Sequence, residues 1–299
     1  MTSIICVCIA FVILLQTVII PSQKLKEANA LIESGDYNVA YALLEEIERN
    51  DVIAESKYNR ALVLLESDDY ITAYELLDGL NYQDSEDKLQ EIKPEYYRED
   101  LKNTQVGDVV FFGAYEQDNN SANGKEDIQW QVLDTQDGKI LVISKYALDC
   151  KPYNNAYEDI TWENCTLRKW LNSDFLNTAF TEEEQKMIPT VTVSADKNPE
   201  YSTNPGNATQ DKVFLLSIQE VQQYFPSNFD ARVCKPTAYA MANNAWESGS
   251  GSYWWLRSSG KIQSRAAIVH SKGDIGVHGD KVNIEHNAVR PAMWINLES

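Results

Sequence analysis

The chain has 299 residues, of which 43% are hydrophobic and 10% aromatic, and such a composition belongs to a folded globular protein rather than a disordered one. Its 45 acidic residues outnumber 26 lysines and arginines, which gives a net charge of -19. The resulting field repels phosphate polyanions, and no basic stripe compensates for it, so we expect no nucleic-acid partner.

An apolar segment begins the chain. No charged residue occurs from Thr2 to Pro21, and this length is close to the roughly 20 residues that span a bilayer. The segment lacks a basic n-region and a small-residue cleavage site, so for residues 1–21 a transmembrane anchor is favoured over a signal segment. Lys24 and Lys26 follow it, and the positive-inside rule alone would keep them cytoplasmic. We nevertheless expect a single-pass protein of the cell membrane, with its C-terminal domains on the extracellular side.

The cysteines leave two interpretations open. Cys6 and Cys8 lie in the apolar segment, and Cys150, Cys165 and Cys234 have no CxxC spacing. One interpretation is that Cys150 and Cys165 form a disulfide if the domain is exported. The alternative is three buried free thiols, and neither interpretation indicates a zinc site.

Residues 22–100 contain an internal repeat. The segment Glu27–Ile47 aligns with Arg60–Leu80, which lies 33 residues further along the chain. Each copy predicts two helices around a polar break, with Asp36 or Asp69 capping the second helix. The pattern resembles tetratricopeptide repeats, whose period is ~34 residues. We therefore predict an all-α helical-repeat stalk in this region.

From residue 101 to 299 the pattern changes to short apolar runs separated by turn residues. Asp137 and Gly138 predict a tight turn that pairs residues 127–133 with residues 139–144 as a hairpin. Apolar residues at helical spacing then predict helices up to Phe180. These features indicate an α+β domain.

Two capping boxes are predicted beyond that point. Thr181 with Glu184 and Ser217 with Glu220 have the spacing of a side chain that caps a helix and a carboxylate that bonds back to it. After the second helix the sequence returns to strand patterns.

An ordered set of blocks carries a resemblance to a known family. The blocks include FGAYEQ, IQWQVLD, TWENCTLRKWLN, YWWLRSSG and AVRPAMWINL. Over residues 104–297 they resemble an uncharacterised bacterial family, the domain of unknown function numbered sixty-two seventy-three. The resemblance implies a fold related to C-type lectins and formylglycine-generating enzymes, with YWWLRSSG and AVRPAMWINL as paired core strands.

The predicted fold class is therefore α+β. It combines a C-type-lectin-like mixed domain of antiparallel strands and short helices with a preceding all-α helical-repeat segment and one N-terminal transmembrane helix. The predicted domains are 1–21, 22–100 and 101–299.

Enzyme chemistry has little support in the residues. A formylglycine-generating oxidase needs a reactive cysteine pair near its carboxyl end, and Cys234, the last cysteine, has no partner nearby. His270, His278 and His286 recur at intervals of eight in a turn-rich stretch without a GxSxG motif, and we interpret them as solvated loop residues. We predict no catalytic residue and no metal ligand.

One loop offers the ligand type that calcium prefers. The segment Gln117–Asp127 is rich in carboxylate and amide oxygens. It lacks the EF-hand spacing, its Asn-Gly turn chemistry explains its composition, and the Glu-Pro-Asn signature of calcium-dependent lectins is missing. We predict no cofactor, with calcium as the open alternative.

The strand patterns place aromatic and cationic residues together. Neighbours in a strand face opposite ways, so Trp255 and Arg257 share one face and Trp254 lies on the other. The same alternation in AVRPAMWINL separates Arg290 and Trp294 from the apolar positions. Such a set favours a surface that stacks sugars or binds acidic peptides. The alternative is arginine packed on tryptophan beneath a covering loop.

The loop before this strand adds Asn243, Asn244 and Trp246, whose amide and aromatic groups are typical of carbohydrate contacts. We expect a non-enzymatic surface protein that binds a cell-surface carbohydrate or a protein ligand. The alternatives are an interaction scaffold that acts through the helical repeats, and an unrecognised enzyme whose cleft holds an acid with a perturbed pKa.

Overall fold

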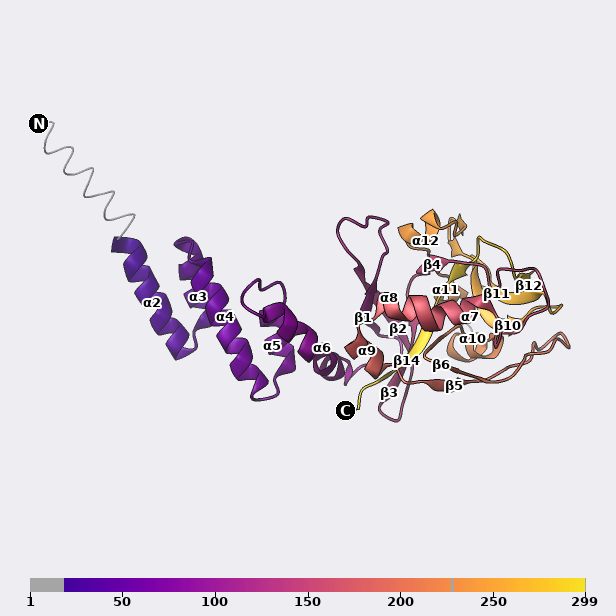
Figure 1. The fold of residues 1–299 in the computed structure, drawn as a ribbon, viewed down its shortest axis with the longest axis horizontal. Helices are drawn as coiled ribbons and strands as arrows, with labels where there is room; N and C mark the ends of the chain where they lie inside the picture. The colour runs from indigo at the N-terminus through magenta and orange to yellow at the C-terminus, as the bar shows by residue number, and fades with distance from the viewer. Residues whose placement is uncertain (1–18, 227–228, 299) are drawn as a thin grey trace, which may run out of the picture. The chain divides into compact units, whose positions relative to one another are not determined.

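The computed structural model describes residues 19–226 and 229–298 (Figure 1). The chain divides into two compact units, and the boundary falls between Tyr96 and Tyr97. Each unit is described by itself.

The N-terminal unit is built from helices. Helix α2 packs against α3, and α4 packs against α5, with the small residues Ala28, Ala40, Ala61 and Ala73 fully buried between them. The last helix, α6, contains the boundary between the units. The helices are α2 (Ile20–Ser34), α3 (Tyr37–Glu46), α4 (Asn50–Leu65), α5 (Tyr70–Leu77) and α6 (Ser85–Leu101).

The predicted fold class needs correction in this region. No helix in the described residues is both long and apolar enough to cross a membrane, and α2 carries Lys24, Lys26 and Glu27. Residues 1–18 of the predicted membrane segment lie outside the described residues. The structure also does not show the helices to be repeats. Of the two predicted caps, Asp69 accepts a hydrogen bond from the Thr72 amide, whereas Asp36 makes no such bond.

The C-terminal unit contains two five-stranded sheets, and the first is antiparallel throughout. The predicted hairpin is confirmed, because β2 and β3 pair from Gln136 opposite Lys139 onward. Its two turn residues, Asp137 and Gly138, have positive φ angles of 49° and 69°, as this type of tight turn requires. The strands across the sheet are β1 (Val109–Tyr115), β2 (Glu126–Gln136), β3 (Lys139–Ser144), β14 (Ala292–Asn296) and β7 (Val213–Phe214).

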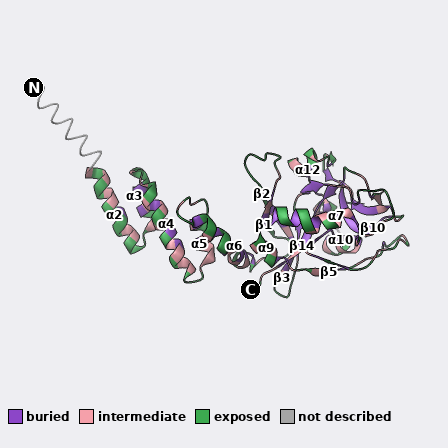
Figure 2. Cartoon of the chain, viewed as in Figure 1, coloured by how far each residue is buried: buried purple, intermediate pink, exposed green. Residues whose placement is uncertain are grey.

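The second sheet holds the tryptophan-rich strand β10 near its centre. Its neighbours are β11, which is antiparallel to it, and the short β13, which is parallel to it. Figure 2 shows β10 as a buried strand. The strands across the sheet are β12 (Ile275–Lys281), β11 (Arg265–Val269), β10 (Trp254–Ser259), β13 (Ala288–Val289) and β4 (Asp149–Cys150).

Short helices and two small hairpins complete the unit. Both predicted capping boxes are confirmed, Thr181 with Glu184 at the start of α9 and Ser217 with Glu220 at the start of α10. The helices are α7 (Thr166–Trp170), continued by a π-helical turn (Leu171–Phe175) and α8 (Leu176–Ala179), then α9 (Glu182–Met187), α10 (Ile218–Tyr224), α11 (Phe229–Arg232) and α12 (Ala238–Ala242). The hairpins are β5 (Val191–Val193) with β6 (Thr209–Asp211), and β8 (Glu247–Ser248) with β9 (Gly251–Ser252).

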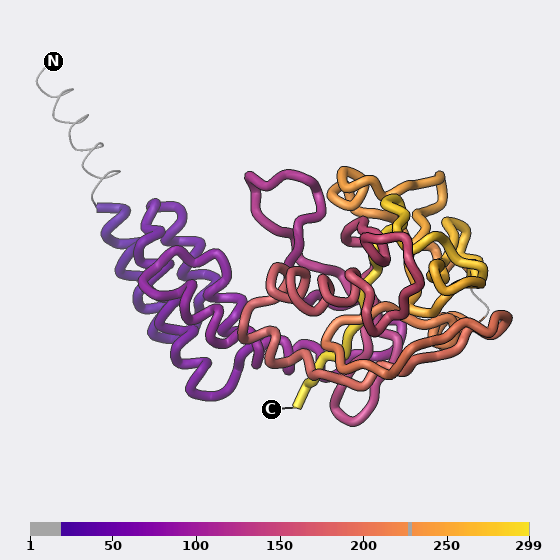
Figure 3. Tube along the Cα trace, turned by 45° about the vertical axis from the view of Figure 1, so that its right-hand side comes forward, coloured from indigo at the N-terminus to yellow at the C-terminus, as the bar shows by residue number. Residues whose placement is uncertain are grey.

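The closing segment of the chain connects the two sheets. It is one strand in the prediction, but it breaks at Arg290 and Pro291 into β13 and β14. Only Ala288 pairs with β10, opposite Trp254, and β14 crosses to lie between β3 and β7. Figure 3 shows this end of the chain, in yellow, running among earlier segments of the C-terminal unit. The predicted pairing of the two core strands is therefore limited to one short parallel contact.

Candidate functional site

Both tryptophans of β10 belong to the core. Trp254 and Trp255 are each 0% exposed. The Trp254 indole nitrogen donates to the Arg232 carbonyl at 3.0 Å, and that of Trp255 donates to the Lys151 carbonyl at 2.9 Å. The Tyr153 ring packs on Trp255, with centroids 5.8 Å apart. Because both faces of this strand are covered, the prediction that Trp255 faces a ligand is wrong.

Arg257 is an internal clamp rather than a surface group. It is 4% exposed, and its guanidinium bonds the carboxylates of Glu220 and Asp196, the latter at 3.1 Å. It also donates to the carbonyls of Leu215 and Ser194, at 2.9 and 3.1 Å. This side chain ties β10 to the start of α10 and to the segment after β5, so it is not available to a ligand.

Arg290 and Trp294 do not complete a shared surface either. Arg290 is 2% exposed, its Nε donates to the Ser144 carbonyl at 2.9 Å, and its guanidinium lies 5.1 Å from the centroid of the Trp254 ring. Burial lowers its pKa. Trp294 is half-buried on β14, in the other sheet. The alternative interpretation, arginine packed on tryptophan under cover, describes Arg290.

The loop residues have a different environment. Trp246 is 44% exposed and lines a hollow of about 470 Å³. Its ring lies against that of Tyr253, with centroids 4.9 Å apart and planes inclined at 55°. We call this the Trp246 hollow, and its lining consists of Asn244, Ala245, Trp246, Glu247, Tyr253 and His286. Two of the predicted ligand residues, Asn244 and Trp246, therefore lie side by side in one concave surface.

Backbone bonds hold the wall of the Trp246 hollow in place. The Trp246 amide donates to the His286 carbonyl at 3.1 Å, and the Ser252 hydroxyl donates to the Trp246 carbonyl at 2.6 Å. The ring of His270 packs edge-on against Tyr253, with centroids 5.2 Å apart, and is itself bonded to Asp274. Tyr253 is thus in contact with two rings, those of Trp246 and His270, which fix its position in the wall.

Asn243, the third predicted loop residue, points elsewhere. Its side-chain amide donates to Oδ1 of the buried Asp149 at 3.1 Å. The Tyr115 hydroxyl donates to Oδ2 of the same carboxylate at 2.8 Å. Burial and the adjacent carboxylate raise the pKa of Tyr115, so this phenol stays protonated and donating. Asn243 therefore has a structural role in a buried polar network.

A second hollow, of about 380 Å³, lies beside α7 and was missed by sequence reasoning. We call it the Lys151 hollow. Lys151, Asn155, Thr166, Lys169, Trp170 and Asp174 contribute to its lining. The Lys151 ammonium lies 4.8 Å from the centroid of the Trp170 ring. The one sequence signal for it is the Lys169-Trp170 pair in an otherwise acidic chain.

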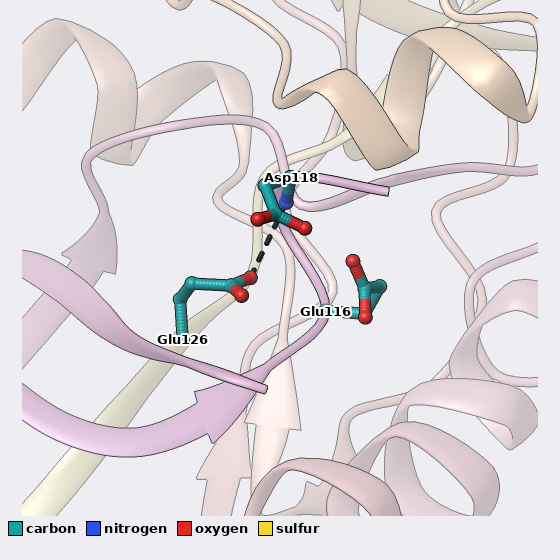
Figure 4. A group of neighbouring side chains, drawn as sticks. All are labelled: Glu116, Asp118 and Glu126. Carbon is teal, nitrogen blue, oxygen red and sulfur yellow. Dashed lines mark hydrogen bonds between the residues drawn. The ribbon is translucent and has the colours of Figure 1, made fainter. Parts of the chain in front are cut away.

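The acidic loop contains three carboxylates that match a hard cation in ligand type. Oxygens of Glu116, Asp118 and Glu126 lie within 4.8 Å of one another (Figure 4), and these residues would hold calcium if the loop bound it. Glu126 already accepts from the amides of Gln117 and Asp118, at 2.7 and 3.2 Å, and Glu116 accepts from the Asn120 amide at 2.9 Å. These hydrogen bonds fold the loop and by themselves explain why the three carboxylates lie together. We therefore assign no metal to this cluster.

The cysteines are free and buried. Cys150, Cys165 and Cys234 have no disulfide partner among the described residues, which follows the free-thiol interpretation. Burial raises the pKa of Cys150 and of Cys165 to about 12. Because the thiolate is the nucleophilic form, neither side chain is poised for thiol chemistry.

The three histidines have separate environments. His270 is bonded to Asp274, His278 lies 2.9 Å from the Tyr201 hydroxyl, and His286 is exposed at the Trp246 hollow. Within the described ranges they form no joint metal-binding cluster. The structure thus gives them no common site.

The comparisons with known proteins place the chain in a family. No curated protein and no solved structure matches it. The family model described as Domain of unknown function (DUF6273) matches residues 137–297. That range starts at the turn of the β2–β3 hairpin and contains the lining of both hollows, but not the acidic loop. Since the match extends over more than half of the 299 residues, the chain belongs to the DUF6273 family.

Proposed function

We propose that the C-terminal unit is a non-enzymatic binding module with a C-type-lectin-like fold, and that its ligand is a carbohydrate met outside the cell. The observation that carries the proposal is the Trp246 hollow, where two adjacent aromatic rings line a concave surface. What supports the lectin-like fold is the α+β architecture, with the closing strand β14 inserted between β3 and β7.

The chemistry of the Trp246 hollow suits a sugar. The apolar face of a pyranose packs on exposed aromatic rings, and Trp246 offers such a face. Asn244, Glu247 and His286 supply amide, carboxylate and imidazole groups at its rim, which would hydrogen-bond to hydroxyls. The volume of about 470 Å³ falls within the roughly 300–1,000 Å³ of small-ligand sites. A site of this size takes one or two sugar rings.

Burial raises the pKa of Tyr153 and of Cys165, and partial burial lowers that of Lys212. None of these three lines the Trp246 hollow. The enzyme hypothesis and the scaffold hypothesis stay predictions, because no described feature favours either.

The test is binding of the full chain to an array of bacterial and host glycans, with and without calcium. Trp246→Ala is expected to weaken binding of any neutral glycan at least tenfold, because it removes the stacking face. Tyr157→Ala is the matched control, since Tyr157 is an exposed aromatic that lines neither hollow. A requirement for calcium would direct attention to Glu116, Asp118 and Glu126.

Two results would overturn the proposal. One is a folded protein that binds no glycan on the array. The other is binding that Trp246→Ala leaves unchanged. Deletion of residues 22–96, which stops at the boundary between the units, adds a further comparison, because the proposal expects glycan binding to survive it, whereas the scaffold hypothesis expects loss of a partner.

A further inference from the structure

The Lys151 hollow differs from the Trp246 hollow in its charge. Its wall carries two lysines, Lys151 and Lys169, in a chain whose net charge is -19. The lysines come from segments on either side of Tyr153 and Trp162, which are both buried. The fold thus gathers cations from two parts of the chain around one cavity of about 380 Å³.

Lys151 is positioned by its neighbours, but its ammonium forms no hydrogen bond with those that the structure describes. Its side chain is 35% exposed, and its ammonium makes no hydrogen bond with any residue of the described chain. The Trp170 ring supports it at 4.8 Å, and the nearest carboxylate oxygen, Oδ2 of Asp149, lies 4.0 Å away. That carboxylate already accepts from Tyr115 and Asn243. The ammonium therefore has donors left for an anion in the cavity.

Lys169 adds a second ammonium group to the Lys151 hollow. It is exposed, and within the described residues its ammonium has no ion-pair or hydrogen-bond partner. Some other surface lysines are paired, for example Lys186 with Glu183 at 2.6 Å. Lys151 pairs with Asp149 only at 4.0 Å, so both ammonium groups line one cavity with hydrogen-bond donors left for a negative group of a ligand.

The rest of the lining indicates what else the ligand carries. Asp174 contributes an exposed carboxylate, and Asn155 contributes a side-chain amide. Carboxylates accept hydrogen bonds from hydroxyls, and amides both donate and accept. An inorganic anion without hydroxyls has nothing to donate to Asp174, whereas a hydroxyl-rich molecule with one acidic group would use all four side chains.

We propose that the Lys151 hollow is a second saccharide site, selective for sugars that bear a carboxylate. The carboxylate pairs with Lys151 and Lys169, and ring hydroxyls bond to Asp174 and Asn155. The Trp170 ring positions Lys151 and does not itself stack the sugar, because the ammonium covers it. The site is separate from the Trp246 hollow and does not rest on the function proposed above.

The experiment is calorimetric titration of the full chain with a uronic-acid tetrasaccharide and with its carboxyl-reduced, neutral counterpart. We expect the acidic tetrasaccharide to bind at least tenfold more tightly than the neutral one at low salt, and the preference to shrink as salt rises. Lys151→Gln should weaken the acidic ligand about tenfold or more, because a charge-assisted bond is lost. Lys169→Gln should weaken it about threefold, because that ammonium is more exposed.

Two controls separate this site from others. Lys272→Gln removes an exposed lysine that lines neither hollow and should leave the affinity unchanged. Trp246→Ala should leave the preference for the acidic over the neutral tetrasaccharide in place, so failure at one hollow is distinguishable from failure at the other. Equal affinity for the acidic and neutral tetrasaccharides, or full affinity in Lys169→Gln and Lys151→Gln proteins, would overturn the proposal. Displacement of the sugar by an equal concentration of inorganic phosphate would do the same.

Discussion

Two neighbouring stretches of this chain contain the same residue type in opposite environments. The loop that leads into β8 exposes Trp246, and β10, which starts eight residues later, buries Trp254 and Trp255 completely. Nothing in residue type distinguishes them. The difference comes from coverage, since β10 lies inside a sheet and is packed on both faces, whereas the loop lies at a rim. An aromatic residue therefore indicates a binding surface only when the rest of the chain leaves it uncovered.

The cations also divide into covered and uncovered side chains. Arg257 has two carboxylates and two carbonyls as partners, so its charge is used inside the protein. Lys151 has one face supported by an indole and its ammonium turned to a cavity. Arg257 therefore stabilises the fold, whereas the Lys151 ammonium, 4.0 Å from its one carboxylate partner, keeps hydrogen-bond donors for a ligand. Substitution of a cation that stabilises the fold should therefore lower the free energy of unfolding more than substitution of one that lines a hollow.

The largest effect is expected at Arg257. Arg257→Ala leaves Glu220 and Asp196 without their partner and removes the bonds that join β10 to α10. Loss of one partner of a buried ion pair costs about 3–5 kcal/mol, and we expect the free energy of unfolding to fall by the upper part of this range. Urea unfolding followed by tryptophan fluorescence measures it. Arg265→Ala, at a partly exposed arginine of β11, is the control. A loss below about 1 kcal/mol at Arg257 would contradict the clamp.

A contrast between tryptophans tests the comparison directly. Trp255→Ala removes a fully buried ring, and truncation of a core aromatic costs about 3–5 kcal/mol. Trp246→Ala, at an exposed position, should change the free energy of unfolding by less than about 0.5 kcal/mol. Both follow from urea denaturation under the same conditions. Similar losses in the two proteins would show that the loop and the strand are not different environments.

A smaller effect is expected in the buried network around Asp149. Tyr115→Phe keeps the ring contact with Phe175 and removes the hydroxyl that donates to the carboxylate. A buried acceptor that loses one donor costs about 1–3 kcal/mol. Thermal unfolding gives the value, with Tyr157→Phe as the exposed control. An unchanged midpoint would mean that water replaces the hydroxyl.

The last effect is a dependence on alkaline pH. Burial raises the pKa of Cys150 and Cys165 from the ordinary 9.0 to about 12 in the folded protein. The unfolded chain therefore loses these protons first as pH rises. The stability that these protons contribute is fully present below about pH 9 and is lost progressively as pH rises toward 12. Thermal midpoints measured between pH 8 and 11 should fall, and fall less in a Cys150→Ala protein. Rapid labelling of Cys150 or Cys165 in the native protein at pH 8, located by peptide mapping, would contradict the burial.

Sequence reasoning succeeded where the determining contacts are local. The Asp137-Gly138 turn sets the β2–β3 hairpin, and the pairs Thr181 with Glu184 and Ser217 with Glu220 start their helices, because each structure is decided within four residues. The cap at Asp36 was predicted by the same logic and is not formed. Asn244 and Trp246 were chosen for their chemistry, and they share a hollow.

What only the tertiary structure decided is which side chains are covered. Trp255 is covered by Tyr153, and Arg257 by Glu220, each from a distant part of the chain. The break at Arg290 and Pro291 sends β14 into the other sheet, so strand alternation could not assign its faces. The Lys151 hollow also joins separate segments. The sequence by itself determined the β2–β3 turn, the two capping boxes and the family, because these depend on neighbours or on resemblance over most of the C-terminal unit. Burial depends on packing between segments far apart, and for that reason it became visible only in the fold.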